Sequence, residues 1–249
     1  MTPQQQQYGR VVRRILDEID GETEAIHRAA ELVCSTIMKD ELVHVVGTGG
    51  HSNMGTYEMF CRAGCLAAVN PLLDPSTLLS AGALRSMAME RTPGLARVEL
   101  DAFNVTSGVL VICNAYGINA LTIDSALEAK RRGVPTIGVT STSFADHVPA
   151  NHPARHPSGK NLYQSVDVFV NCHMPLNDAV VEFEGLQQKA GPTSTFCLAY
   201  TLNLMTLETV RLLLEAGHDP LLWSSANMPG GDEANARCVE KYKGRVRLL

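Results

Sequence analysis

Short apolar segments of strand type, each followed by a polar turn and a helical segment, constrain the fold of this chain most strongly. The apolar runs lie at Leu42–Val46, Cys65–Val69, Val109–Cys113, Val134–Val139 and Val166–Val170. Short buried strands that alternate with longer helices predict a parallel β-sheet covered by helices on both faces. Ligands bind such sheets at the carboxyl ends of the strands. We therefore expect the turns at 47–52, 114–119 and 140–143 to surround one site.

The first of these turns has the composition of an anion-binding loop. The run Leu42–Val46 ends in Gly47-Thr48-Gly49-Gly50-His51-Ser52, and a helix is expected from about Met54. Glycines leave backbone N–H groups open to a ligand, and a helix start adds partial positive charge. Hydroxyl groups in the turn can donate further hydrogen bonds. The turn is predicted to hold a phosphate or a carboxylate, with a plain strand-to-helix turn as the alternative.

Two nucleotide-binding patterns are compatible only in part with this turn. A dinucleotide fingerprint needs a third glycine where Ser52 stands, and an acidic residue where the second strand ends at Asn70. A Walker loop needs a lysine, and no lysine lies near the turn. Hydrolysis of nucleoside triphosphates is therefore excluded, and dinucleotide binding is disfavoured.

An amphipathic helical segment precedes the first strand. From Tyr8 to Met38 apolar residues recur at spacings of three, four and seven, and Asp20-Gly21 interrupts them. We expect residues 1–7 to be disordered. Residues 1–40 are expected to form a helical lead-in that packs on the domain at 41–249 or on a second subunit.

The composition of the chain limits the binding partners and the cellular compartment that we expect for it. The net charge of −5, without a basic run interleaved with aromatic residues, disfavours nucleic acid and anionic membranes as partners. The seven cysteines form no Cys-x-x-Cys pair and lie mostly in apolar runs, as reduced cysteines do. The first residues lack the apolar centre of a signal peptide. We expect a cytoplasmic protein without a metal, because no histidine or cysteine pair has ligand spacing.

Three titratable residues are candidates for proton transfer in a sugar. Such a reaction needs a carboxylate or an imidazole near the reacting carbons and a second group that moves protons between oxygens. Glu58, about two helical turns beyond Ser52, is the candidate base, with a solvent-exposed helical glutamate as the alternative. His51, which the turn would hold at the site, is a second candidate, and His156 in the long loop at 144–164 is a candidate acid or proton shuttle. Either histidine can instead be an ordinary backbone-bonded or exposed one.

Two further segments belong to the expected site. Gly191-Pro192-Thr193-Ser194-Thr195 precedes a strongly apolar helix expected over Phe196–Ala216, and proline with several hydroxyls makes another helix start suited to anions. The third strand ends in Asn114-Ala115-Tyr116-Gly117-Ile118-Asn119. His44, which alternates on the first strand, is expected to be a satisfied histidine of the core or of the sheet face.

Together these segments resemble a sugar isomerase (SIS) domain. The resemblance rests on the helical lead-in, the turn at 47–52, the turn that ends Gly117-Ile118-Asn119, and the late helix behind Gly191–Thr195. Arg62-Ala63-Gly64, Val69-Asn70-Pro71, Arg155-His156 with Ser158-Gly159-Lys160, and Ser225-Ala226-Asn227 with Gly230-Gly231-Asp232-Glu233 more narrowly resemble a bacterial family of single-domain SIS proteins. The match covers nearly the whole chain.

The resemblance implies a three-layer α-β-α sandwich with a five-stranded parallel sheet, and homodimers or homotetramers in which a neighbouring subunit completes the site. It implies a phosphosugar site at the strand ends. The implied ligand contacts are Ser52, Thr140, Ser141, Thr193, Ser194 and Thr195, and the glycine turn itself adds Gly49 and Gly50 as expected contacts. SIS domains read Ser-x-Ser-Gly-x-Ser/Thr in the second turn, where this chain has Asn114, Tyr116 and Asn119. The phosphate cradle is therefore either rebuilt there or used by another group.

The resemblance favours a cofactor-independent enzyme. We expect it to bind a sugar phosphate or sugar acid and to interconvert aldose and ketose forms, with Glu58 as the base. Ser52, Thr140 and Ser141 would hold the anionic end. A lyase or etherase acting on a phosphorylated sugar is an alternative. A sensor of the sugar phosphate is another, but about forty mixed-charge residues are too few for the DNA-binding domain that such regulators carry.

Overall fold

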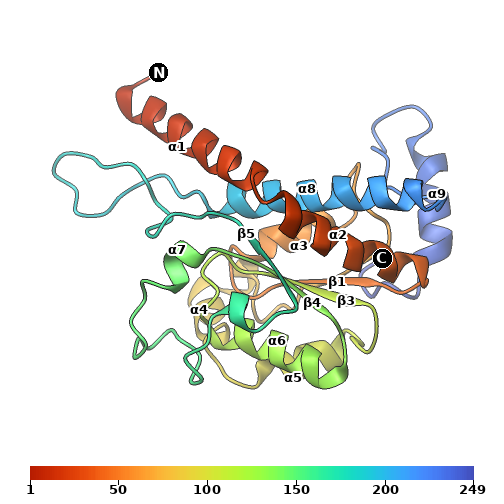
Figure 1. The fold of residues 1–249 in the computed structure, drawn as a ribbon, viewed down its shortest axis with the longest axis horizontal. Helices are drawn as coiled ribbons and strands as arrows, with labels where there is room; N and C mark the ends of the chain where they lie inside the picture. The colour runs from red at the N-terminus through yellow and green to blue at the C-terminus, as the bar shows by residue number, and fades with distance from the viewer.

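Five parallel strands form the central sheet of the computed structural model, which describes residues 1–249 (Figure 1). Their order is β2-β1-β3-β4-β5. Relative to β1, the second strand lies on one side and the third, fourth and fifth strands lie on the other. The order of strands therefore reverses between β1 and β3, and in open α/β sheets ligands bind at such a switch point. The bounds are β1 Val43–Gly47, β2 Val69–Leu72, β3 Val109–Cys113, β4 Thr136–Thr140 and β5 Val168–Asn171.

Helices cover both faces of this sheet, as Figure 1 shows. One face carries α1, α2, α3 and α8, and the other carries α5 and α6, with α4 beside them. The bounds are α1 Pro3–Asp20, α2 Thr23–Met38, α3 Asn53–Met59, α4 Ala83–Met89, α5 Leu95–Ala102, α6 Ala120–Arg132, α7 Thr142–Ala145, α8 Ser194–Glu215 and α9 Gly231–Tyr242. The fold is the α/β sandwich that the sequence predicts.

Alternation along the strands divides the interior into two cores. On β1, Val43 and Val45 face the larger core of 33 buried residues, whereas Val46 faces the smaller core of 12. Successive side chains of a strand point to opposite faces, so a strand buried on both sides must be apolar throughout. Short, continuously apolar strand segments are therefore the signature of this sheet in the sequence.

Helix α8 is the long apolar helix of the larger core. It is long and apolar enough to cross a membrane by length and composition alone. In the structure its residues Leu198, Leu202 and Met205 are buried in the larger core. Burial against the sheet thus gives this helix its apolar character here.

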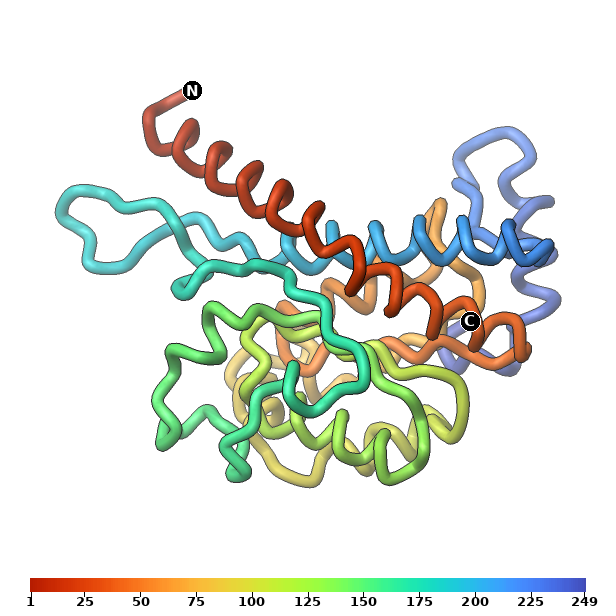
Figure 2. Tube along the Cα trace, in the orientation of Figure 1, coloured from red at the N-terminus to blue at the C-terminus, as the bar shows by residue number.

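The segment between β5 and α8 leaves the body of the molecule and returns beside the first turns of α1 (Figure 2). The Tyr8 hydroxyl donates to the carbonyl of Pro192 at 2.6 Å, and the Gln7 amide to the carbonyl of Val180 at 3.5 Å. A short edge strand is expected at 179–183, but this segment contains only one bridge, between Val181 and Ala190.

The N-terminus differs from the expectation of disorder over residues 1–7. Helix α1 begins at Pro3, and the Thr2 side chain accepts a hydrogen bond from the backbone of Gln5 while the Gln5 side chain accepts one from Thr2. This capping box satisfies two donors at the helix start. Residues 4–7 are four glutamines, which suggested disorder in the sequence, but they belong to a regular helix start. The interruption at Asp20-Gly21 does separate α1 from α2.

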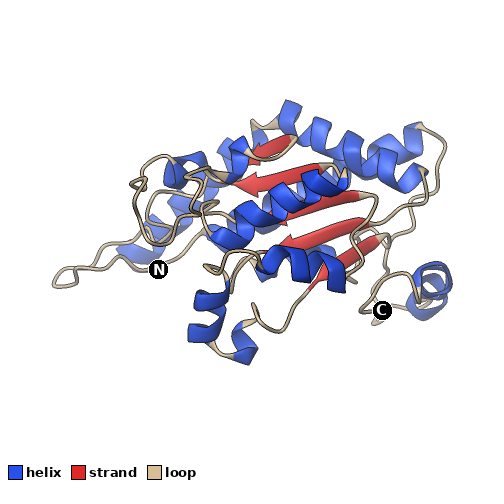
Figure 3. Cartoon of the chain, turned by 90° about the horizontal axis from the view of Figure 1, so that it is seen from below, coloured by secondary structure: helices blue, strands red, loops and turns tan.

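The region after the first turn also differs in detail. The second strand lies at Val69–Leu72 rather than at 65–69, at the edge of the sheet (Figure 3), where Pro71 is tolerated. The helix expected over Thr77–Glu90 is divided. A turn of 3₁₀-helix at Leu79–Ala81 and α4 are separated by Gly82, whose φ of 117° no helix accommodates.

His44 is a satisfied buried histidine. Its Nε2 lies 3.1 Å from the carbonyl of Ser107, and its Nδ1 lies 3.0 Å from the Asn70 amide nitrogen. Burial lowers the pKa of His44 to about 4, so the ring is neutral near pH 7. Asn70 also accepts a hydrogen bond from the backbone of Arg247, which ties the C-terminal segment to the sheet.

Glu99 on α5 is a buried carboxyl without a hydrogen-bond partner. It is 1% exposed, and neither of its carboxyl oxygens is bonded. Burial, together with the nearby charge of Asp74, raises the pKa of Glu99 to about 8. The folded state therefore keeps a proton that the unfolded chain releases near pH 4.5.

We expect Glu99→Gln to flatten the pH dependence of stability. The raised pKa stabilises the native state fully below about pH 4.5 and is lost as the pH rises through about 8, a change on the order of a few kcal/mol. Denaturant unfolding from pH 5 to 9 measures it. Glu240→Gln, on the exposed side of α9, is the control and should keep the wild-type slope. An unchanged slope in Glu99→Gln would contradict the assignment.

Candidate functional site

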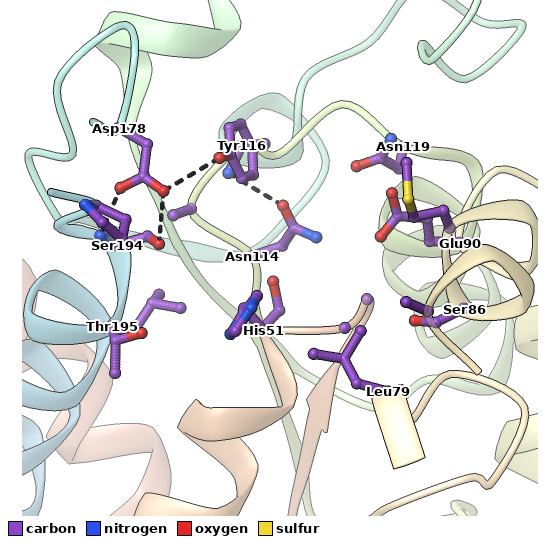
Figure 4. A pocket seen from close by; sticks show the side chains of 18 residues that line it. His51, Leu79, Ser86, Glu90, Asn114, Tyr116, Asn119, Asp178, Ser194 and Thr195 are labelled. Carbon is purple, nitrogen blue, oxygen red and sulfur yellow. Dashed lines mark hydrogen bonds between the residues drawn. The ribbon is translucent and has the colours of Figure 1, made fainter. Parts of the chain in front are cut away.

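A cavity of about 500 Å³ opens at the carboxyl ends of β1 and β3 (Figure 4). The turn after β1, the turn after β3, the region of α4 and the start of α8 form its walls. Its lining comprises Gly49, Gly50, His51, Ser52, Leu79, Ala83, Ser86, Met87, Glu90, Asn114, Ala115, Tyr116, Asn119, Asp178, Pro192, Ser194, Thr195 and Leu198.

The turn after β1 presents unpaired backbone donors to this cavity. The N–H groups of Gly49, Gly50, His51 and Ser52 make no hydrogen bond within the protein. The turn folds back so tightly that a Cβ at Gly47 would lie 2.3 Å from the carbonyl oxygen of Ser52. Consecutive free N–H groups at a concave turn attract an anion. This turn has the geometry that the sequence predicts for an anion cradle.

The turn after β3 is closed by its own side chain. The Asn114 carbonyl oxygen accepts hydrogen bonds from the backbone of Tyr116 at 3.0 Å and of Gly117 at 2.9 Å. Its amide group donates to the hydroxyl of Thr48 at 3.0 Å. The asparagine side chain thus takes two backbone donors of this turn, those of Tyr116 and Gly117. The N–H groups of Ala115, Ile118 and Asn119 make no hydrogen bond within the protein.

The start of α8 is also occupied, by the carboxylate of Asp178. One oxygen of Asp178 accepts from the backbone of Thr193 at 2.8 Å and of Ser194 at 2.7 Å. The other accepts from the Ser194 hydroxyl at 3.0 Å and from the Tyr116 hydroxyl at 3.2 Å. A carboxylate at a helix N-terminus is stabilised by these donors and by the helix dipole.

Tyr116 connects the two closed segments. Its ring packs edge-on against Phe144, with centroids 4.6 Å apart, and its hydroxyl reaches Asp178. Burial, then the charge of Asp178, raises the pKa of Tyr116 well above its ordinary value. The phenol therefore remains protonated and acts as a hydrogen-bond donor.

Glu90, the residue that ends α4, is the free carboxyl group of the cavity. No hydrogen bond or ion pair engages its side chain, and a Cβ added at Gly49 would lie 2.3 Å from its Oε2 atom. Its carboxyl group is therefore packed against the turn after β1. Burial raises the pKa of Glu90, because a low-dielectric environment disfavours the charged form. Such a carboxyl can exchange a proton with a bound ligand.

The charges of the cavity are unbalanced. Glu90 and Asp178 line it, and His51 is the sole histidine, while no lysine or arginine side chain contributes. No group of three or more His, Cys, Asp or Glu side chains is arranged to hold a metal ion. Recognition of an anion in this cavity therefore falls to backbone N–H groups.

Most of the residues expected at the site from sequence line this cavity. They are Gly49, Gly50, His51, Ser52, Asn114, Tyr116, Asn119, Ser194 and Thr195. Of these, the Asn114 side chain makes hydrogen bonds within the protein, and the Asn119 amide donates to the carbonyl of Ala154. The Tyr116 and Ser194 hydroxyls donate to Asp178. The side chains of His51, Ser52 and Thr195 line the cavity and make no hydrogen bond within the protein.

Glu58, the base expected from sequence, lies outside the cavity lining. Its carboxylate accepts from the Asn203 amide at 2.7 Å and pairs with Arg62 at 3.1 Å. Glu58 lies about two helical turns beyond Ser52. At this position its side chain lies at the contact between α3 and α8 and not beside the turn after β1. Helical rotation, which places every third or fourth residue on the same face, accounts for the difference.

Thr140, Ser141 and Thr193 are not cavity residues either, since all three are fully buried. The Ser141 hydroxyl donates to the carbonyl of Met174 at 2.6 Å, and the Thr193 hydroxyl donates to Asp178. The Thr140 hydroxyl packs against Gly117, where a Cβ would lie 2.3 Å away. These hydroxyls satisfy neighbouring loops instead of a ligand.

His156 lies away from the cavity, on the outer side of α6. Its Nε2 is 3.0 Å from Asp124, and its Nδ1 is 2.7 Å from the Ser158 hydroxyl. Arg155 donates to carbonyl groups of Ala145 and Val148 in the same loop. The long loop at 144–164 is thus held by its own polar contacts.

Glu90 and Asp178 line the cavity but belong to no motif in the sequence. Glu90 has the appearance of an ordinary helix-terminal glutamate, and Asp178 lies in a loop without a motif. The one available signal was the helix start at 192–195, because a carboxylate that follows β5 is well placed to occupy it.

Comparison with known proteins gives one family. Residues 7–141 match the model of the SIS domain family. The chain is 35% identical over 229 residues to a UPF0309 protein of Halalkalibacterium halodurans, covering 92% of this chain and 90% of that protein. It is 32% identical to one of Geobacillus thermodenitrificans, covering 98% and 96%, and 34% identical to one of Caldanaerobacter subterraneus, covering 96% and 97%.

We expect Asn114→Ala to destabilise the protein by about 1–3 kcal/mol, because two buried backbone donors lose their acceptor. Urea unfolding measures the loss. Asn203→Ala, which removes a half-buried amide between α8 and Glu58, is the matched control and should cost less. Equal stability of Asn114→Ala and the wild type would show that solvent replaces the amide.

Proposed function

The chain belongs to the SIS domain family, and from that premise we propose that it binds a sugar phosphate or sugar acid in the cavity at the ends of β1 and β3 and interconverts its aldose and ketose forms. Membership of this family implies a role related to sugars or phosphosugars. The reaction itself is our proposal, and it is supported by the groups that line the cavity.

The anionic end of the ligand is assigned to the turn after β1. Its four unbonded N–H groups, from Gly49 to Ser52, are the free donors that an anion needs. In the other two segments Asn114 and Asp178 take part of the backbone donors, and the unbonded N–H groups there form shorter consecutive runs. A ligand anchored on this turn would extend its carbon chain past Glu90 and His51, which line the same cavity.

Glu90 is the proposed base. It would take the proton from the carbon next to the carbonyl, while the carbonyl electrons move to oxygen and that oxygen receives a proton from His51. In the resulting enediol, the hydroxyl group on the carbon that lost its proton gives a proton to His51. Glu90 then delivers its proton to the former carbonyl carbon. Protons and electrons balance without a cofactor.

One observation carries this assignment, namely the free and half-buried carboxyl of Glu90 beside the anion cradle. A base must be able to gain and lose a proton near the working pH, and burial moves the pKa of Glu90 upward in that direction. Glu58, in contrast, is held by Asn203 and Arg62 outside the cavity lining.

We expect sugar phosphates or sugar acids to raise the melting temperature more than their uncharged counterparts. A ligand that binds only the native state adds RT ln(1 + [L]/Kd) to stability. A thermal-shift panel of matched pairs, each sugar with and without its phosphate or carboxylate, measures the difference. If no pair differs, or the uncharged members stabilise more, the cradle is not an anion site and the proposed function fails.

Glu90→Gln should lower kcat on the sugars identified in this way by about 10²–10⁴-fold, with a smaller change in ligand affinity. Glu58→Gln is the matched control and should keep most of its activity. Isomerisation is followed by the exchange of solvent deuterium into the product. Loss of turnover in Glu58→Gln but not in Glu90→Gln would return the role of base to Glu58.

A further inference from the structure

We propose that Asp178 is a built-in anion that restricts the cavity to ligands with a single anionic end. This inference rests on the proposed function and adds a specificity to it. Ligands with a phosphate or carboxylate at both ends would be rejected, and a neutral, hydroxyl-bearing end would face Asp178. The start of α8 forms the wall of the cavity opposite Glu90.

The contacts of Asp178 are those that a bound oxyanion would make. Its carboxylate receives two backbone N–H groups, from Thr193 and Ser194, at 2.8 and 2.7 Å. The Thr193, Ser194 and Tyr116 hydroxyls point to the same carboxylate, at 3.3, 3.0 and 3.2 Å. Asp178 is 9% exposed. The first two backbone donors at the start of α8, which could otherwise hold an oxyanion, are therefore engaged by the chain itself, whereas the N–H group of Thr195 stays unbonded.

The position of Asp178 in the cavity explains how its carboxylate would distinguish between ligands. Figure 4 shows Asp178, Ser194 and Thr195 on one side and Leu79, Ser86 and Glu90 on the other, with His51 and Asn114 between them. A ligand that spans the cavity from the turn after β1 toward α8 ends near the carboxylate of Asp178. Like charges repel strongly where water is excluded.

Nothing in the lining offsets that repulsion. Neither lysine nor arginine faces the cavity, and the donors nearest to Asp178 already serve it. A second anionic group would lie beside the Asp178 carboxylate without a cationic side chain to pair with, and a charge without a counter-charge in such a site is costly. A hydroxyl group can instead share the hydrogen bonds of Ser194 and Tyr116.

A purely structural role is the competing explanation, because Asp178 also fastens the segment between β5 and α8. Asp167 provides the matched control. Its carboxylate accepts from the backbone and the hydroxyl of Thr136, both at 2.8 Å, but it lies outside the cavity. Replacement of either aspartate removes a carboxylate that holds backbone donors, and only one of them faces the ligand.

The test compares wild type, Asp178→Ala, Asp178→Asn and Asp167→Asn. Asp178→Ala vacates the start of α8, whereas Asp178→Asn fills it without a charge and retains the fold if the alanine variant unfolds. The probes are inorganic phosphate, fructose 6-phosphate and fructose 1,6-bisphosphate. Binding is measured by calorimetry and by the shift in melting temperature.

We expect the wild type and Asp167→Asn to bind the monophosphate more tightly than the bisphosphate. In both Asp178 variants the affinity for the bisphosphate relative to the monophosphate should rise by about tenfold or more, since one unit charge and its hydrogen bonds are removed. Inorganic phosphate should raise the melting temperature of Asp178→Ala more than that of the wild type.

Two outcomes would overturn the inference, and they are separate from failure of the proposed function. An unchanged ratio of the two affinities in both Asp178 variants would leave Asp178 a structural residue, while binding of the monophosphate would still support the function. If no sugar binds any variant, the proposed function fails. The inference is then decided by inorganic phosphate, whose effect on Asp178→Ala must exceed that on the wild type.

Discussion

Backbone N–H groups at the ends of parallel strands must find acceptors, and this requirement organises the functional end of the molecule. The turns after β1 and β3 and the start of α8 all bring such groups to one edge of the sheet. Asn114 satisfies part of one set, Asp178 satisfies part of another, and the set from Gly49 to Ser52 stays entirely open. Because unsatisfied donors at a concave surface attract anions, the turn after β1 offers the longest run of donors to a charged ligand.

The sequence predicted those parts of the structure whose signals are local. Strands of continuous apolar residues, the break at Gly21 and the glycine turn after β1 each follow from neighbouring residues, and all three are present. The second strand lies a few residues later than expected and includes Asn70, whose side chain is bonded inside the protein to His44, and Pro71, which is tolerated at the sheet edge. The order of the strands, and with it the switch point between β1 and β3, depends on contacts distant in sequence.

The site was predictable to the extent that its residues belong to the strand-end turns. His51, Ser52 and Tyr116 were expected and line the cavity, whereas Thr140 and Ser141 lie in the interior although they stand at the carboxyl end of β4. The sequence of a turn indicates where its backbone lies in the fold, but it does not indicate the direction in which each side chain points. The contribution of Asp178 depends on its distance in space from the start of α8, which only the folded chain determines.

The position of the free carboxyl relative to the anion cradle has a further chemical consequence. An anion bound to the turn after β1 would lie near Glu90, whose carboxyl is packed against Gly49. A nearby negative charge disfavours ionisation of a carboxyl group, so the ligand would raise the pKa of Glu90 beyond the effect of burial alone. A carboxyl whose pKa approaches the working pH is a more effective acid and base in turn, as an isomerisation requires. On this argument the charge of the ligand would help to activate the group that reacts with it, and the absence of lysine and arginine from the cavity would preserve that effect.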